Sequence, residues 1–138
     1  MGQPRYPAPA VLACKGGFET EAAVSQSTAL LLSIMIESAV AAALVGATRW
    51  GSLPRAALAA VLATLATHWA VWWSVPWLTP RLGYGPTVAA VEGAVVAVEA
   101  IAYRLLVTQR WPRALAVSLA ANAASTSFGL ALYMLGLA

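Results

Sequence analysis

Two glutamates stand inside one long apolar stretch of the chain, residues 86–107. Glu92 and Glu99 are seven residues apart, which places them on one face of a helix, two turns from each other. Tyr103 follows Glu99 by four residues and shares that face. The stretch has about the ~20 residues that a helix needs to cross a bilayer. An ionised carboxylate at membrane depth costs at least ~2.5 kcal/mol, so both side chains must face protein, water or a bound cation.

Three further apolar runs each carry one strongly polar residue near the middle. They are residues 26–48 with Glu37, residues 56–78 with His68, and residues 114–137 with Asn122. At 1.5 Å per residue, these side chains and the two glutamates all fall within the middle half of a hydrocarbon core ~30 Å thick. We therefore expect a polar column inside a helical bundle, which forms a pathway for protons, cations or a substrate. Its predicted members are Glu37, His68, Glu92, Glu99, Asn122, Tyr103, Ser118 and Ser125.

The composition is that of an integral membrane protein. Of the 138 residues, 61% are apolar and 9% are charged, whereas a soluble domain carries about 25% charged residues. The sequence predicts an all-α integral membrane protein, a four-transmembrane-helix bundle, in the plasma (inner) membrane. The net charge of +3 forms no basic soluble face, which excludes nucleic-acid binding. The expected partners are the lipid bilayer and either further copies of the chain, in a homo-oligomer, or a larger membrane complex.

The chain divides into two parts. Residues 1–25 hold prolines and glycines without a periodic apolar face, which is typical of a disordered extramembrane tail. Residues 26–138 hold the four predicted spans. The turn that begins with Arg49-Trp50 resembles the turn that begins with Arg110-Trp111, and each follows a run that contains glutamate. This similarity indicates two tandem helical hairpins in parallel orientation, a pattern known from transporters.

Three functions are compatible with a polar column of this kind. The first is transport or exchange of protons or small cations. The alternative is a non-catalytic transmembrane subunit that packs its polar face in a larger membrane complex. The third is a membrane enzyme with a Glu/His metal centre, for which Glu37, His68, Glu92 and Glu99 are the candidate ligands. No catalytic motif and no metal motif of fixed spacing occurs in the chain, so we predict neither catalytic residues nor a cofactor.

His68 has a predicted role of its own. It lies at a depth similar to that of Glu92 and Glu37, and a buried polar group without a partner is costly. We therefore expect His68 to hydrogen-bond one of these two glutamates, directly or through one water. By the same reasoning on depth, Glu99 is expected to have Tyr103 and Asn122 as its polar neighbours.

The arginines predict the orientation in the membrane. Five of them lie in or beside the first and third turns, namely Arg49, Arg55, Arg104, Arg110 and Arg113, and the second turn has only Arg81. By the positive-inside rule, both basic turns are cytoplasmic and both termini are extracytoplasmic. Fused after Ala138, a reporter enzyme that works only in the periplasm should therefore be active, and a reporter that works only in the cytoplasm should be inactive. A fusion that is active only as a cytoplasmic reporter would reverse this orientation.

Overall fold

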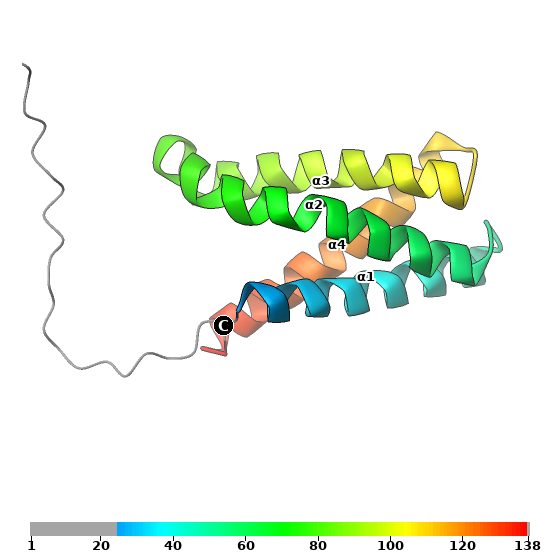
Figure 1. Ribbon diagram of the computed structural model, residues 1–138, viewed down its shortest axis with the longest axis horizontal. Coiled ribbons are helices and arrows are strands. Elements are labelled where there is room, and N and C mark those ends of the chain that lie inside the picture. The colour runs from blue at the N-terminus through cyan, green and yellow to red at the C-terminus, as the bar shows by residue number, and fades with distance from the viewer. Residues whose placement is uncertain (1–24, 138) are drawn as a thin grey trace, which may run out of the picture.

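The chain folds into four long helices, as the computed structural model shows for residues 25–137 (Figure 1). They are α1 (Gln26–Thr48), α2 (Leu53–Leu82), α3 (Tyr84–Leu106) and α4 (Trp111–Met134), and the described residues contain no strand. The predicted all-helical class is confirmed. Helices α1, α2 and α4 are long and apolar enough to cross a membrane. The predicted tail, apart from Ser25, lies outside the described residues.

The two ends of α1 follow from local hydrogen bonding and backbone geometry. The Ser25 hydroxyl accepts a hydrogen bond from the Thr28 amide at 3.1 Å and so satisfies one of the free amides at the start of the helix. At the other end Arg49 adopts a left-handed conformation, with φ at 55°, and its amide bonds back to the carbonyl of Gly46. Helix α1 thus has the bounds that the apolar run 26–48 predicts.

Helix α2 is longer than the predicted run 56–78, and the longer turn expected between this run and residues 86–107 is wrong. The helix continues through Pro76 and Pro80 to Leu82, and only Gly83 separates it from α3. A proline removes one helical hydrogen bond, but these two prolines stand four residues apart and leave the helix between them intact. The Thr79 hydroxyl donates to the Val75 carbonyl at 2.7 Å beside the second proline. Gly83, with φ at 82°, takes the positive-φ conformation that reverses the chain.

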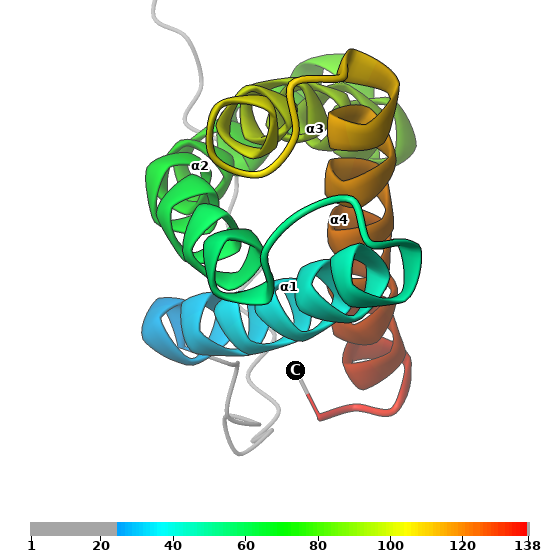
Figure 2. The same cartoon turned by 90° about the vertical axis from the view of Figure 1, so that its right-hand side faces the viewer.

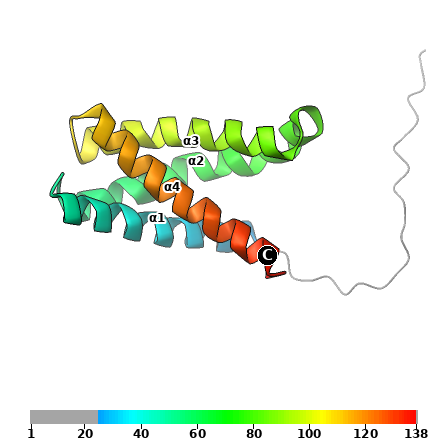
Figure 3. The ribbon, with the colours of Figure 1, turned by 180° about the vertical axis from the view of Figure 1, so that it is seen from behind.

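The helices form a ring in which each one packs against two neighbours, in the order α1, α2, α3, α4 and back to α1 (Figure 2). Among the described helices, the diagonal pairs α1–α3 and α2–α4 do not approach each other closely. The turns that join α1 to α2 and α3 to α4 lie at the same end, which we call the arginine end (Figure 1). Helix α4 runs obliquely, from beside α3 at this end to beside α1 at the other (Figure 3).

The apolar core lies toward the arginine end. Its buried members are Ala41, Val45, Ala56, Ala59, Ala60, Tyr103, Ala114 and Val117. Most of them are alanines, whose small side chains allow helices to pack closely in a membrane. Toward the opposite end, α1 and the end of α4 diverge from the α2–α3 hairpin (Figures 1 and 3). We call this the open end.

Gly51 allows the α1–α2 turn to close over the arginine end. A Cβ atom at this position would lie 2.8 Å from both the carbonyl oxygen and a methyl carbon of Val107, which follows α3. We therefore expect Gly51→Ala to lower the free energy of unfolding by about 1–3 kcal/mol through overpacking. Thermal unfolding in detergent would measure this loss. The control is Gly85→Ala, where the new methyl group meets nothing within 4 Å, and equal stability of the two variants would contradict this packing.

Candidate functional site

A cavity of about 220 Å³ occupies the centre of the ring and receives side chains from all four helices. It is lined by Ser33, Glu37, Thr64, Thr67, His68, Val71, Glu92, Val95, Glu99, Asn122, Ser125, Thr126 and Gly129. We call it the polar cavity. Its lining includes three glutamates and one histidine but no lysine or arginine. The cavity therefore carries the chemistry of a cation site.

Six of the eight residues predicted for the polar column line this cavity. They are Glu37, His68, Glu92, Glu99, Asn122 and Ser125. The other two predicted residues, Ser118 and Tyr103, are fully buried just beyond it. The expected hydroxyl residues Thr64 and Thr126 also line the cavity, whereas sequence reasoning missed Thr67. The signal for Thr67 was available, because it shares a face of α2 with Thr64, one turn away.

Glu37 joins three helices through its two carboxylate oxygens. The Thr64 hydroxyl on α2 donates to Oε2, and the Ser125 hydroxyl on α4 donates to Oε1 at 2.7 Å. Both oxygens of this buried side chain are therefore satisfied. Carboxylates accept hydrogen bonds from hydroxyl groups without needing a cationic partner. Glu37 is thus the best-anchored acidic group of the cavity.

Glu99 is held less completely. Its side chain is 1% exposed, its Oε2 lies 3.4 Å from the Ser118 hydroxyl, and its Oε1 has no partner among the described residues. The expected contacts to Tyr103 and Asn122 are not formed. The Tyr103 hydroxyl is buried without a hydrogen bond, and Asn122 Oδ1 accepts from the Thr126 hydroxyl at 3.2 Å. Side chains on one helical face can still point in different directions, because the face does not fix the rotamer.

His68 forms no direct hydrogen bond to Glu37 or Glu92, since its buried Nε2 atom has no partner in the described part of the chain. The imidazole instead stacks on Trp72, one turn further along α2, with ring centroids 6.1 Å apart. This stack holds the ring beside its own helix. The depth of His68 along its helix correctly indicated that it lines the same cavity as Glu37 and Glu92. The contact with Trp72 determines the direction in which its imidazole ring points.

Glu92 lies nearer the open end than Glu99, two turns earlier on α3. It is partly buried and lines both the polar cavity and a neighbouring cavity of about 240 Å³ between α3 and α4. This neighbouring cavity is also lined by Asn122 and Thr126. Glu92 is therefore the acidic group of the cavity with the most open surroundings.

Each hydroxyl that reaches a glutamate also reaches a backbone carbonyl. Thr64 lies 2.8 Å from the Ala60 carbonyl, Ser118 lies 3.0 Å from that of Val96, and Ser125 lies 3.0 Å from that of Asn122. A hydroxyl has one proton to donate and can accept in return. When the glutamate is ionised, the hydroxyl donates to it. When the glutamate is protonated, the hydroxyl can donate to the carbonyl and accept from the carboxyl group.

The polar cavity and the apolar core occupy successive layers of the bundle. On α1, the core residues Ala41 and Val45 follow Glu37, and on α3 Tyr103 follows Glu99. On α2 and α4 the core residues precede Thr64 and Asn122. The core therefore separates the polar cavity from the arginine end. The cavity residues Ser33 and Gly129 lie on the other side, toward the open end.

The acidic side chains and His68 do not gather into a metal site. Within residues 25–137, no three histidine, cysteine, aspartate or glutamate side chains come close enough to hold a metal ion. Catalytic zinc sites are built from three protein ligands. The hypothesis of a Glu/His metal centre thus receives no support from the described residues.

The anchoring of Glu37 generates a stability prediction. Thr64→Val keeps the shape of the side chain but removes the donor to Glu37 Oε2, which leaves a buried acceptor unsatisfied. We expect a loss of about 1–3 kcal/mol in the free energy of unfolding, measured by thermal or chemical unfolding in detergent. The control is Ser38→Ala, because the Ser38 hydroxyl has no partner in the described part of the chain. An equal loss for both variants would show that the Thr64–Glu37 bond does not stabilise the bundle.

Comparisons with known protein families, with curated protein sequences and with solved structures found no match to this chain. A functional assignment must therefore rest on the cavity and its side chains. The chain is an all-helical protein with three helices suited to crossing a membrane and a polar cavity at the centre of its ring.

Proposed function

We propose that the chain crosses the plasma (inner) membrane four times and exchanges protons or small cations through the polar cavity. The observation that carries this proposal is the pair of acceptors around each hydroxyl that contacts a glutamate. A group that exchanges protons must be stable both with and without its proton. Thr64 and Ser125 provide this for Glu37, and Ser118 provides it for Glu99.

The charge of the cavity supports cations over anions. Glu37, Glu92 and Glu99 line the same space, and no basic residue other than His68 does so. Intramembrane carboxylates facing a bundle interior mark ion and proton pathways in membrane proteins. Glu99 is the strongest candidate for the exchanging group, because its Oε1 has no partner among the described residues.

The layered arrangement supports a pathway with one closed side. In the proposed orientation, the open end faces the extracytoplasmic side and the apolar core blocks the cytoplasmic side. A proton that reaches Glu99 must pass Tyr103 and the alanine-rich core to continue toward the arginine end. Such passage requires a change in helix packing at that end. A single bundle of this size is small for such a motion, so we propose that the chain works as a homo-oligomer.

We further propose that the bundle is built from two tandem hairpins in parallel orientation, α1–α2 and α3–α4. Helix α2 buries Ala56, Ala59, Ala60, Ala63 and Thr64, and α4 buries Ala114, Val117, Ser118, Ala121 and Asn122 with the same spacing. Both helices begin with a proline in the first turn. Glu37 bonds Thr64 in the first hairpin, and Glu99 contacts Ser118 in the second, one turn nearer the arginine end on both helices. Each hairpin thus supplies one glutamate and one hydroxyl partner.

Glu99→Gln tests the proposed function. The substitution keeps the shape of the side chain but removes the group that takes up and releases a proton. We expect the variant to fold and its proton flux to fall by about 100-fold, as measured with a pH-sensitive dye in proteoliposomes. Glu92→Gln is the matched control, and its flux should fall much less, because this residue lies nearer the open end.

Two outcomes would contradict this assignment. Full flux in Glu99→Gln together with loss of flux in Glu92→Gln would transfer the exchanging role to Glu92. Unchanged flux in both variants would make the polar cavity structural. Co-purification of the native chain with unrelated membrane subunits in fixed ratio would then favour the role of a non-catalytic subunit.

A further inference from the structure

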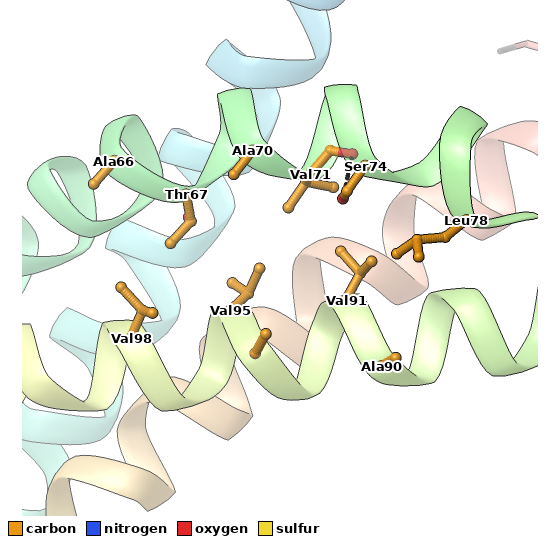
Figure 4. A pocket seen from close by; sticks show the side chains of 11 residues that line it. Ala66, Thr67, Ala70, Val71, Ser74, Leu78, Ala90, Val91, Val95 and Val98 are labelled. Carbon is orange, nitrogen blue, oxygen red and sulfur yellow. Dashed lines mark hydrogen bonds between the residues drawn. The ribbon is translucent and has the colours of Figure 1, made fainter.

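A third cavity, of about 340 Å³, lies between α2 and α3 (Figure 4). Its rim includes Ala70, Ala90 and Ala94, whose side chains are exposed on the outer surface of the bundle. Its other lining residues are four valines, Ala66, Leu78 and two hydroxyl residues, Thr67 and Ser74. We call it the apolar groove. Figure 4 shows side chains from both helices turned toward it. Its volume lies in the range of about 300–1,000 Å³ that is typical of small-molecule sites.

The apolar groove and the polar cavity share part of their lining. Thr67, Val71 and Val95 line both spaces. A single layer of side chains therefore separates the outer surface of the α2–α3 hairpin from the glutamates. His68, the neighbour of Thr67 in sequence, faces the polar cavity. An apolar space open to the surroundings thus adjoins an acidic space in the interior.

We infer that the apolar groove binds an amphipathic organic cation, whose apolar part fills the groove and whose charge is attracted by Glu99 across the shared layer of Thr67, Val71 and Val95. This inference rests on the proposed function and names a substrate class for it. The groove offers apolar surface that a hydrophobic group fills favourably. Glu99 lies buried behind that layer, its Oε1 has no partner among the described residues, and it attracts the cation through an interior of low dielectric constant.

Charge complementarity selects this occupant over others that could fill an apolar groove. A lipid with an anionic head group would place its charge beside three glutamates and be repelled. An apolar helix of another chain could cover the groove, but it would not use the carboxylates behind Thr67 and Val95. A small inorganic cation could reach the glutamates but would leave the groove unused. Only a ligand that is both cationic and apolar is favoured both by the groove and by the glutamates behind it.

The test uses the full chain in lipid nanodiscs and radiolabelled tetraphenylphosphonium as the probe. We expect saturable binding to the wild type and competition by excess unlabelled probe, but none by tetramethylammonium, which lacks the apolar part. Ala70→Leu and Ala90→Leu fill the groove from α2 and from α3, and each should weaken binding about tenfold or more. Ala39→Leu adds the same bulk to the exposed face of α1 and should bind the probe like the wild type. Glu99→Gln should also weaken binding about tenfold or more.

The outcomes separate this inference from the proposed function. Absence of saturable binding to the wild type overturns the inference, as does wild-type affinity in Glu99→Gln or in both groove variants when these are folded. Size-exclusion profiles and thermal midpoints establish whether each variant is folded. If either Ala70→Leu or Ala90→Leu does not fold, the other variant provides the test of the groove. Proton flux in the same preparations tests the proposed function alone. If Glu99→Gln loses proton flux but the wild type binds no probe, the proton pathway stands and the cation site does not. If Glu99→Gln loses probe binding but keeps its proton flux, the cation site stands and the proton pathway does not.

Discussion

The fold depends on how acidic side chains are accommodated inside a helical bundle without basic partners. Glu37 solves this with hydroxyl groups, since it accepts from Thr64 on α2 and from Ser125 on α4. These two bonds fix α1 against both of its neighbours in the ring. The oblique course of α4 then becomes necessary, because Ser118 must reach α3 near the arginine end while Ser125 must reach α1 further along (Figure 3).

Glu37 and Glu99, one from each hairpin, are accommodated unequally. Glu37 has a donor for each oxygen, whereas Glu99 has one distant donor and one unpartnered oxygen in the described part of the chain. An unsatisfied buried acceptor lowers stability, and a functional role or a bound water or ion can account for it. A fully satisfied carboxylate holds helices together, and an incompletely satisfied one remains able to take a ligand or a proton.

Much of this arrangement could be predicted from the sequence, because apolar runs of helical length give the positions of helices. The runs 26–48 and 86–107 correspond closely to α1 and α3, and the depth of each polar residue placed six of eight predicted residues in one cavity. The proline and glycine residues of 79–86 misled the prediction for the end of α2, since the helix continues through Pro80 to Leu82. Hydrogen-bond partners were not predictable for Glu99 or His68. Helical periodicity gives the face on which a residue lies, but rotamers and the Trp72 stack decide which atoms meet.

The ring without diagonal contacts has a mechanical consequence. Four helices that pack only against their neighbours can shift so that the cross-section of the ring changes from a square to a rhombus, while each neighbouring pair keeps its packing distance. Such a shift brings one diagonal pair of helices, α1–α3 or α2–α4, closer together and moves the other pair apart. The space at the centre of the ring therefore changes without a break in any helix. Close-packed helices slide in small steps of this kind during shear motions. The short connections at Gly83 and at the two arginine-end turns would serve as joints in such a movement, which would change the shape of the ring without unfolding a helix.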